Sequence, residues 1–198
     1  MKRFTYWGMG GVVFLVVALC AGSAAMAADK TLVIGSKNFT EQRILGQMMI
    51  QLLQAKGFKC EDKTGLGGTL VARKALENGQ IDMYMEYTGT ALVTMLKEKE
   101  VITDPKACYA FVKKADLERN GLVWLPYMAF NNTYCLMMRK DQAAAKGIKT
   151  LSDLSAYVKA HPDEIAFGTN EEFYARPDGY KPLQVKYDFQ FSRDKNDS

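Results

Sequence analysis

The stretch that decides the fold is Val33-Ile34-Gly35-Ser36-Lys37-Asn38-Phe39-Thr40-Glu41-Gln42. A short apolar run ends at Gly35, small polar residues follow, and a strongly periodic helix is predicted to begin. Strand-turn-helix steps of this kind hold ligands at the carboxyl edge of open parallel sheets. The turn carries Lys37 and several hydroxyl and amide groups but no nucleophile-base pair, which favours capture of a small molecule over chemistry on it.

The helix after this turn has the clearest periodicity in the chain. Its apolar residues are expected to share one face: Ile44, Leu45, Met48, Met49, Leu52 and Leu53. Asn38 followed three residues later by Glu41 predicts a capping box, and Gly57 lies where helices commonly end. We also expect Met48, Met49, Met83 and Met85 to fill the core.

The rest of the chain alternates between strand-like and helix-like segments. We predict strands at residues 31–35, 58–63, 81–84, 122–127, 133–138 and 164–167. Helices are predicted at 70–78, from the turn 87–90 to about 99, from 104–105 to about 120, at 152–160 and at 180–187. Residues 191–198 are polar and lack periodicity. Repeated strand-helix alternation predicts an α/β fold with a largely parallel sheet.

The first 27 residues read as a cleaved secretory signal peptide. Lys2 and Arg3 precede the apolar run 12–19, and Ala25-Met26-Ala27 has the small-residue pattern of a cleavage site. The run is shorter than the ~20 residues that a membrane-spanning helix needs. We therefore expect export with cleavage near Ala27 and a periplasmic or extracytoplasmic location; a retained membrane anchor is the alternative.

The remaining chain carries little net charge, because loss of Lys2 and Arg3 lowers the formal value from +4 to +2. Its charges are interspersed, unlike the concentrated basic face of a nucleic-acid-binding protein. Three cysteines remain, Cys60, Cys108 and Cys135, so at least one thiol is expected to be free. Their spacing and the single His161 fit no structural zinc site.

Three predicted turns, at residues 36–38, 67–69 and 87–90, each follow a strand and open a helix. In a parallel sheet these turns would surround one crevice. Helix amino ends favour a carboxylate or phosphate there, and Lys37 adds a full positive charge. The alternative is that Lys37 is a solvated loop lysine and the glycines are ordinary turn residues.

Five tyrosines lie in or beside predicted turns: Tyr84, Tyr87, Tyr134, Tyr174 and Tyr180. Tyrosine faces can surround a quaternary ammonium, although residues at the edge of a core are the commoner case. Arg176 could clamp a carboxylate through its planar fork, or it could form a local surface pair with Asp178.

Five stretches then occur in a recognisable order: Gly35-Ser36-Lys37-Asn38-Phe39-Thr40-Glu41-Gln42, Gly65-Leu66-Gly67-Gly68-Thr69, Asp82-Met83-Tyr84-Met85-Glu86-Tyr87-Thr88-Gly89-Thr90, Asn132-Thr133-Tyr134 and Phe173-Tyr174-Ala175-Arg176-Pro177-Asp178-Gly179. Together they resemble the substrate-binding proteins of ABC importers for glycine betaine, choline, carnitine and related osmoprotectants. The resemblance covers about residues 31–188.

The resemblance implies an α/β, periplasmic-binding-protein-like (type II) fold whose two lobes close on the ligand. We expect the signal peptide at 1–27, the first lobe at 28–130 and a partial second lobe at 131–198, since residues 128–132 lie between two predicted strands. The implied function is capture of a quaternary-ammonium osmoprotectant and its delivery to an ABC permease in the membrane. It implies a monomer that is not an enzyme and needs no cofactor, metal or nucleic acid.

Carried over by motif, the resemblance also implies the ligand contacts. Tyr87 and Tyr134 would form the cage around the ammonium group, and Lys37, Thr90 and Arg176 would hold the carboxylate. The motifs do not fix the direction of Tyr84.

Two features depart from the family pattern. Met85 stands where proline is common, and the chain stops at Ser198 whereas family members are longer. We therefore expect a second lobe that is incomplete. The alternatives to an osmoprotectant-binding protein are a truncated, non-functional fragment of one, or an enzyme on this fold with Glu41 or Glu86 as its base.

Overall fold

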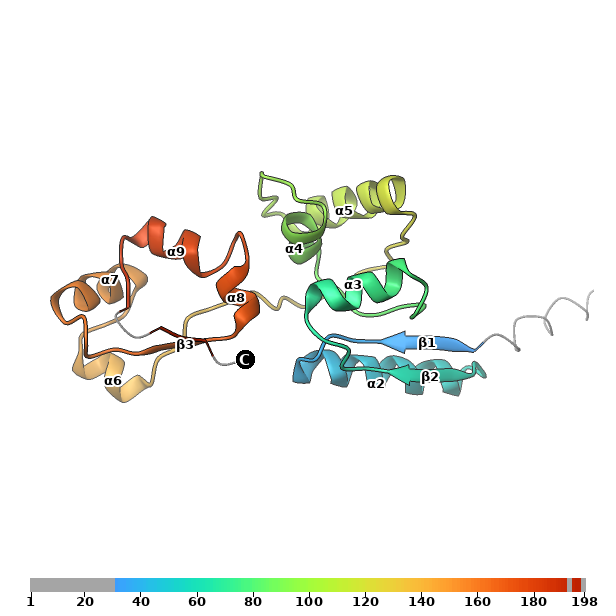
Figure 1. The fold of residues 1–198 in the computed structure, drawn as a ribbon, viewed down its shortest axis with the longest axis horizontal. Helices are drawn as coiled ribbons and strands as arrows, with labels where there is room; N and C mark the ends of the chain where they lie inside the picture. Colours follow the sequence, from blue (N-terminus) through green and yellow to red (C-terminus); the bar gives the residue numbers. More distant parts are fainter. Residues whose placement is uncertain (1–30, 192–193, 197–198) are drawn as a thin grey trace, which may run out of the picture. The chain divides into compact units, whose positions relative to one another are not determined.

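The computed structural model describes residues 31–191 and 194–196, so the predicted signal peptide lies outside the described residues. The chain forms two compact units that divide between Met85 and Glu86 (Figure 1). The predicted lobe boundary at 130–131 is a different division and stays a prediction. No helix in the described ranges is long and apolar enough to cross a membrane.

The first unit is built on two short parallel strands. Its elements are β1 (Leu32–Gly35), α2 (Thr40–Ala55), β2 (Cys60–Lys63) and α3 (Thr69–Glu77). Leu32 lies opposite Cys60 in the register of β1 and β2, and α2 packs against both strands. The third predicted strand is reduced to one parallel bridge between Met83 and Ile34. The strand-helix-strand order predicted from the sequence is confirmed.

The sequence predicted the C-terminal end of α2 correctly but not the way its N-terminal end is capped. The prediction of a capping box by Asn38 and Glu41 is wrong, because Phe39 is the N-cap residue and no side chain caps the helix there. Gly57 has φ of 87°, the left-handed conformation expected just beyond a helix end.

The buried face of α2 is not the one that the apolar pattern predicted. Its fully buried residues are Gln42, Gly46 and Ile50. Leu45, Met49 and Leu53 are half-buried, whereas Ile44, Met48 and Leu52 are exposed. Gly46 explains this choice of face, because a Cβ atom there would lie 2.6 Å from Thr64 Cγ2 and the helix sits close to the turn below it. The expectation that Met48 fills the core is therefore wrong.

The second unit contains most of the helices. Its elements are α4 (Thr88–Thr90), the π-helical turn η1 (Ala91–Met95), α5 (Pro105–Asn120), α6 (Lys140–Ala145), α7 (Leu151–Ala160), β3 (Phe167–Thr169), α8 (Glu171–Ala175), α9 (Tyr180–Tyr187) and β4 (Asp194–Asn196). One apolar cluster joins η1 to α5 around Leu92 and Val112. A second cluster is largely aromatic and gathers Val158, Tyr180, Phe189 and Phe191.

Several predicted elements of the second unit are confirmed. Helix α5 begins at Pro105 after Asp104, whose Oδ1 accepts a hydrogen bond of 2.7 Å from Ala107 N, and it ends before Gly121. Helices α7 and α9 also lie where the periodicity placed them. The predicted helix to residue 99 ends earlier, because the chain turns at Lys97, whose φ is 58°.

Other elements of this unit were predicted wrongly or missed. Residues 122–127 and 133–138 form no strand in the described structure, although their residues favour strands. Isolated β-propensity needs a neighbouring strand to become a ladder. The strand predicted at 164–167 is β3, shifted to Phe167–Thr169, and it pairs in parallel with β4 in the polar tail. Helices α6 and α8 were not predicted.

A group of polar side chains connects α6 and α7 to the turn that follows α7. Lys146 Nζ donates to Tyr157 Oη at 2.8 Å and to Glu164 Oε2 at 2.9 Å, and Tyr157 Oη donates to the same carboxylate. His161 Nδ1 lies 3.1 Å from Glu164 Oε1. The hydrogen bond from Tyr157, followed by that from Lys146, lowers the pKa of Glu164 from its ordinary value of 4.5 to about 2.

This network makes stability depend on acid in a defined range. Because the folded pKa of Glu164 lies below its unfolded value, the carboxylate stabilises the folded state above pH 4.5, and this contribution is lost as the pH falls towards about 2. We expect Glu164→Gln to flatten the decline of the free energy of unfolding over that range, as measured by urea titration at several pH values. Tyr157→Phe, which removes the largest cause of the shift, should flatten it partly. An unchanged pH profile in Glu164→Gln would contradict this assignment.

Candidate ligand-binding site

The turn after β1 is held by hydrogen bonds to the glycine loop that precedes α3. Ser36 Oγ accepts a bond of 2.8 Å from Gly65 N, and Asn38 N donates to Gly67 O at 2.8 Å. Leu66 N also donates to Ser36 O at 3.0 Å. The predicted turns at 36–38 and 67–69 therefore do lie together. The third, at 87–90, belongs to the second unit.

Glycine is favoured in this loop by its backbone conformation. Gly65 has φ of +80°, a left-handed value, and a Cβ atom there would lie 2.9 Å from the Arg43 guanidinium. The loop can thus approach the turn closely with its backbone.

Lys37 is buried at the centre of this turn. Only 2% of the residue is exposed, and neighbouring Ser36 is fully buried. The alternative of a solvated loop lysine is therefore wrong. Lysine is seldom buried to this extent in proteins, so its position is unusual for a purely structural turn residue.

Gln42 is a candidate site residue that the sequence interpretation missed. It lies in the first turn of α2, it is fully buried, and neither its Nε2 nor its Oε1 hydrogen-bonds to any described residue. Gln42 shares a helix face with Gly46, whose added Cβ would lie 3.4 Å from Ser36 Cβ, so this face lies towards the turn. The sequence did contain a signal for this, because Gln42 lies four positions before Gly46 and so shares the helix face on which the glycine allows close packing.

In the second unit, three predicted site residues come together although they are distant in sequence. Arg176 Nη1 donates a 3.0 Å hydrogen bond to Thr90 Oγ1, and Arg176 Cζ lies 5.3 Å from the centre of the Tyr134 ring. Arg176 is 7% exposed, as is Thr90. The structure thus brings Thr90, Tyr134 and Arg176 together.

The guanidinium of Arg176 is also fixed by carboxylates. Its Nε and Nη2 each donate a 2.8 Å hydrogen bond to Asp178, and Glu172 Oε1 lies 3.8 Å from Nη1. The local Arg-Asp pair suggested by the sequence is real, with Arg176 buried and Asp178 at the surface. Burial acts to lower the pKa of Arg176, whereas the hydrogen bond and charge of Asp178 raise it, and the result lies above the usual value.

The negative charges of Glu172 and Asp178 act on Tyr134. Burial, followed by the charge of Glu172, raises the pKa of its phenol above the usual value. Its ring packs against Phe173 with the centres 4.8 Å apart, yet 47% of the residue remains exposed. The ring is therefore fixed in place while part of it stays accessible.

The remaining tyrosines have different surroundings. Tyr87 Oη accepts a 3.0 Å hydrogen bond from Asn132 Nδ2, and Phe130 lies edge-on to the Tyr87 ring at 6.5 Å. Tyr180 is 1% exposed and stacks on Phe167, so it belongs to the core. Tyr174 packs against the same cluster. Tyr84 lies in the first unit.

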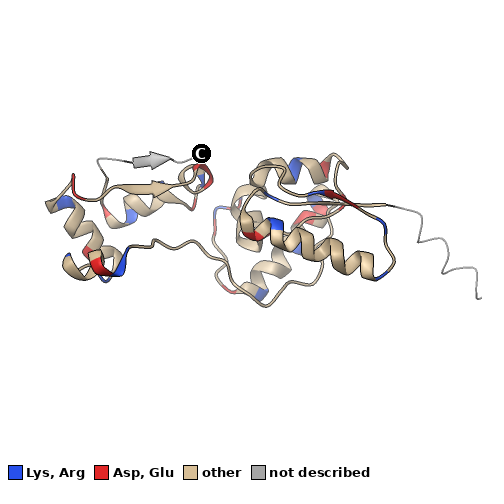
Figure 2. Cartoon of the chain, turned by 90° about the horizontal axis from the view of Figure 1, so that it is seen from below, with Lys and Arg blue, Asp and Glu red and all other residues tan. Residues whose placement is uncertain are grey.

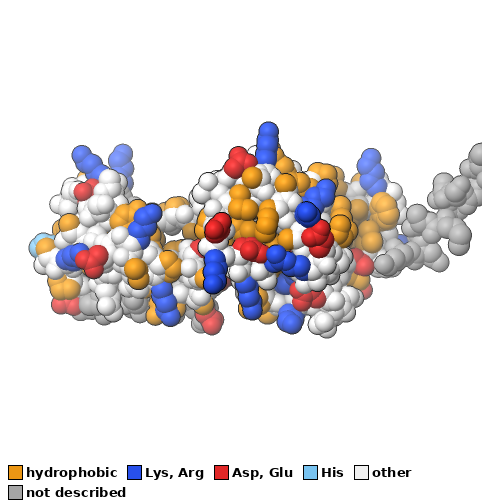
Figure 3. All heavy atoms as spheres, turned by 90° about the horizontal axis from the view of Figure 1, so that it is seen from above, with side chains coloured by type: hydrophobic (Ala, Val, Ile, Leu, Met, Phe, Trp, Pro, Cys, Tyr) orange, Lys and Arg blue, Asp and Glu red, His pale blue; other side chains and the backbone are white. Residues whose placement is uncertain are grey.

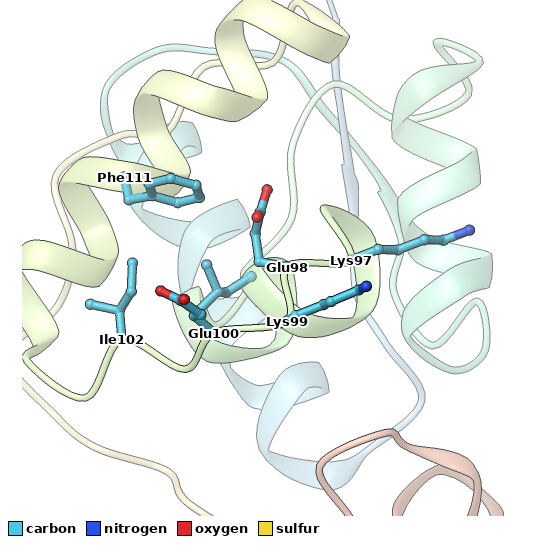
Figure 4. Close-up of a pocket in the computed structure, with 7 residues that line it drawn as sticks. Lys97, Glu98, Lys99, Glu100, Ile102 and Phe111 are labelled. Atoms are coloured by element: carbon cyan, nitrogen blue, oxygen red, sulfur yellow. The ribbon is translucent and has the colours of Figure 1, made fainter.

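A separate hollow of about 450 Å³ lies in the second unit, and none of the predicted site residues lines it. Its lining consists of Leu92, Lys97, Glu98, Lys99, Glu100, Ile102 and Phe111. Figure 4 shows Ile102 and Phe111 on one side of it and the ammonium ends of Lys97 and Lys99 directed away from them.

The charges on the surface are mixed. On the face drawn in Figure 3, the described lysine and arginine side chains alternate with acidic and hydrophobic ones and form no concentrated basic patch. Cys60, Cys108 and Cys135 are all free thiols, which confirms the prediction of at least one. No three His, Cys, Asp or Glu side chains of the described residues are arranged to hold a metal ion.

The chain is similar to known proteins over nearly all of the described residues. Residues 30–197 match the family OpuAC, described as the substrate binding domain of ABC-type glycine betaine transport system. A glycine-betaine-binding protein of Pseudomonas aeruginosa is 44% identical over 181 residues, which are 88% of this chain. An ergothioneine transport permease/ergothioneine binding protein, EgtU of Helicobacter pylori, is 34% identical over 193 residues, 96% of this chain.

A solved structure agrees with these matches. The apo form of YehZ from Escherichia coli superimposes with a TM-score of 0.57 at 30% identity, over 85% of this chain and 62% of that one. This match confirms the predicted α/β, periplasmic-binding-protein-like fold. The chain spans 57% of the length of the Pseudomonas relative and 34% of the Helicobacter one.

The two buried polar residues near the turn should respond oppositely to substitution. We expect Gln42→Leu to leave the free energy of unfolding unchanged or to raise it by about 1–3 kcal/mol, because the replaced amide makes no hydrogen bond to the described residues. Ser36→Ala should lower it by about 1–2 kcal/mol, because it removes the acceptor of Gly65 N. Urea unfolding followed by circular dichroism measures both. A loss in Gln42→Leu as large as that in Ser36→Ala would show that the Gln42 amide has a structural role.

Proposed function

The chain belongs to the family of substrate-binding domains of ABC-type glycine betaine transport systems, and from this premise we propose that it captures a quaternary-ammonium osmoprotectant such as glycine betaine or choline. It would do so outside the cytoplasm, after cleavage near Ala27, and deliver the ligand to an ABC permease. The process is binding and release without a catalytic step or a cofactor.

The observation that carries this proposal is the cluster of Thr90, Tyr134 and Arg176. Two carboxylates, those of Asp178 and Glu172, flank one guanidinium in it, so the group has net negative charge at neutral pH. A half-exposed tyrosine ring beside this charge suits a permanent cation, which gains both from the ring face and from the carboxylates. Tyr87 is the second proposed ring of the cage.

The same cluster also offers donors for a carboxylate. A guanidinium has five N–H groups, and the hydrogen bonds to Asp178 and Thr90 use three of them. The donors that remain are on Nη1 and Nη2, in a group whose orientation Asp178 already fixes. We propose that Arg176 and Thr90 contact the carboxylate of a zwitterionic ligand, and we keep Lys37 as the carboxylate contact that the family motifs imply for the first unit.

The cage assignment predicts a selective loss of affinity. We expect the purified protein to bind glycine betaine or choline in isothermal titration calorimetry. It should show no measurable binding of glycine, which lacks the quaternary ammonium. Tyr134→Ala should weaken binding about tenfold or more, since one cation–π contact contributes roughly 0.5–2 kcal/mol and the ring also shapes the site. Tyr127→Ala is the matched control, because Tyr127 is likewise 47% exposed and lies in the same extended segment. Absence of binding to every quaternary ammonium at millimolar levels would refute the proposed function.

The carboxylate assignment predicts a difference between two ligands. Lys37→Met keeps a long side chain but removes the charge. It should therefore raise the dissociation constant of glycine betaine at least about tenfold. The dissociation constant of choline, which has no carboxylate, should change far less. Calorimetry with both ligands on the same preparation gives the ratio directly. Equal effects on the two ligands would show that Lys37 supports the fold of the turn and does not contact the carboxylate.

A further inference from the structure

The turn that follows α8 brings the backbone of Gly179 against the backbone of Phe173. Gly179 N donates a 3.1 Å hydrogen bond to Arg176 O, which closes the turn, and Gly179 is buried. A Cβ atom on Gly179 would lie 2.0 Å from Phe173 O and 3.1 Å from Phe173 C. These are backbone atoms, and they cannot rotate out of the way as the end of a side chain can. Figure 2 shows acidic and basic residues close together in α8 and this turn.

Pro177 explains why the carbonyl of Phe173 is open to this approach. In a continuing helix, Phe173 O would accept a hydrogen bond from the backbone N–H of residue 177, and proline has no N–H to donate. Helix α8 ends at Ala175, and the chain turns so that Gly179 comes up to the same carbonyl. Only a residue without a side chain fits at this place.

The segments on both sides of this contact are anchored. Phe173 N donates a 2.8 Å hydrogen bond to Oδ1 of Asn170, the N-cap residue of α8. Tyr180, which follows Gly179, is 1% exposed and stacks on Phe167 in the aromatic cluster of this unit. A methyl group on Gly179 would therefore force two anchored segments apart by about 1 Å, because non-bonded carbon and oxygen atoms stay at least about 3 Å apart.

The same two segments carry groups of the candidate ligand site. The Phe173 ring packs against the Tyr134 ring with the centres 4.8 Å apart. Arg176 lies in the turn, where its Cβ would be 3.2 Å from a Cβ on Gly179, and its Nη1 donates to Thr90 Oγ1 at 3.0 Å. The contact at Gly179 therefore sets how far the support of the Tyr134 ring lies from the guanidinium.

Building on the proposed function, we propose that Gly179 is a positioning residue, whose close approach to Phe173 sets the spacing between the Tyr134 ring and the Arg176 guanidinium. Glycine betaine is a short molecule, so its ammonium group and its carboxylate have a nearly fixed separation. The groups that bind them must be held to within about 0.5 Å, and a shift of about 1 Å at Gly179 exceeds this tolerance. Gly179 acts through these neighbours and not by touching the ligand.

Gly179→Ala tests the positioning by isothermal titration calorimetry with glycine betaine. We expect the Kd to rise at least about tenfold. Circular dichroism has to show that the variant is at least about nine-tenths folded, since an unfolded tenth raises the apparent Kd by only about a tenth. A folded variant whose Kd equals that of the wild type would overturn the proposal.

Gly168→Ala is the matched control, because Gly168 lies in β3 of the same unit and an added Cβ there meets nothing within 4 Å. It should leave the Kd unchanged. Phe173→Leu is the second variant, and it decides the question if Gly179→Ala does not fold. It keeps Gly179 and its turn but removes the ring that supports Tyr134, so the Kd should rise about threefold or more. An unchanged Kd would show that Phe173 does not link Gly179 to Tyr134, which would overturn the proposal.

A measurement without ligand distinguishes failure of this proposal from failure of the proposed function. The NMR signals of the Tyr134 ring, assigned with the variant Tyr134→Phe, respond to the neighbouring ring of Phe173. We expect Gly179→Ala to shift these signals and Gly168→Ala to leave them in place. If the wild type binds no quaternary ammonium, the proposed function fails, while shifted Tyr134 signals still support the positioning role. Unshifted signals in Gly179→Ala overturn that role even when the wild type binds the ligand.

Discussion

The close approach of backbone to backbone at the end of β1 is the constraint on which the first unit depends. Ser36 receives a hydrogen bond from Gly65 N, and Asn38 N donates to Gly67 O, so two loops from different parts of the chain are joined directly. This is possible because residues 65 and 67 carry no side chain and Gly65 has a positive φ. Lys37 lies between the two bonded residues Ser36 and Asn38 and is buried. A loop lysine thereby becomes a fixed charge that is held at a defined place.

In the second unit the corresponding constraint is electrostatic. Arg176 is almost fully buried, and a buried guanidinium is stable only when its donors are satisfied. Asp178 and Thr90 satisfy three of them and also determine where the guanidinium points. The same carboxylates that stabilise the arginine make the surroundings of Tyr134 negative. One arrangement therefore serves the fold and also carries the contacts that we propose for a ligand with both charges.

Helix α2 shows what happens when a helix is apolar on more than one side. Periodicity alone cannot decide which side is buried, because Ile44, Met48 and Leu52 are as apolar as their neighbours Leu45, Met49 and Leu53. The decision comes from Gly46, where the absence of a side chain lets the helix approach Thr64. The exposure of Ile44, Met48 and Leu52 is the consequence.

By itself the sequence determined the parts whose signals are local. Proline after Asp104 begins α5, Gly57 and Gly121 follow helix ends, and the strand-turn-helix steps specify an α/β fold with parallel strands. The family motifs named Thr90, Tyr134 and Arg176, which the structure brings together across 86 residues of sequence. Only the tertiary structure decided which face of α2 is buried, that Lys37 and Gln42 are enclosed, and that residues 122–127 and 133–138 form no strand in the described chain. These outcomes depend on what packs or pairs with a segment from elsewhere in the chain, and no local pattern of residues contains that information.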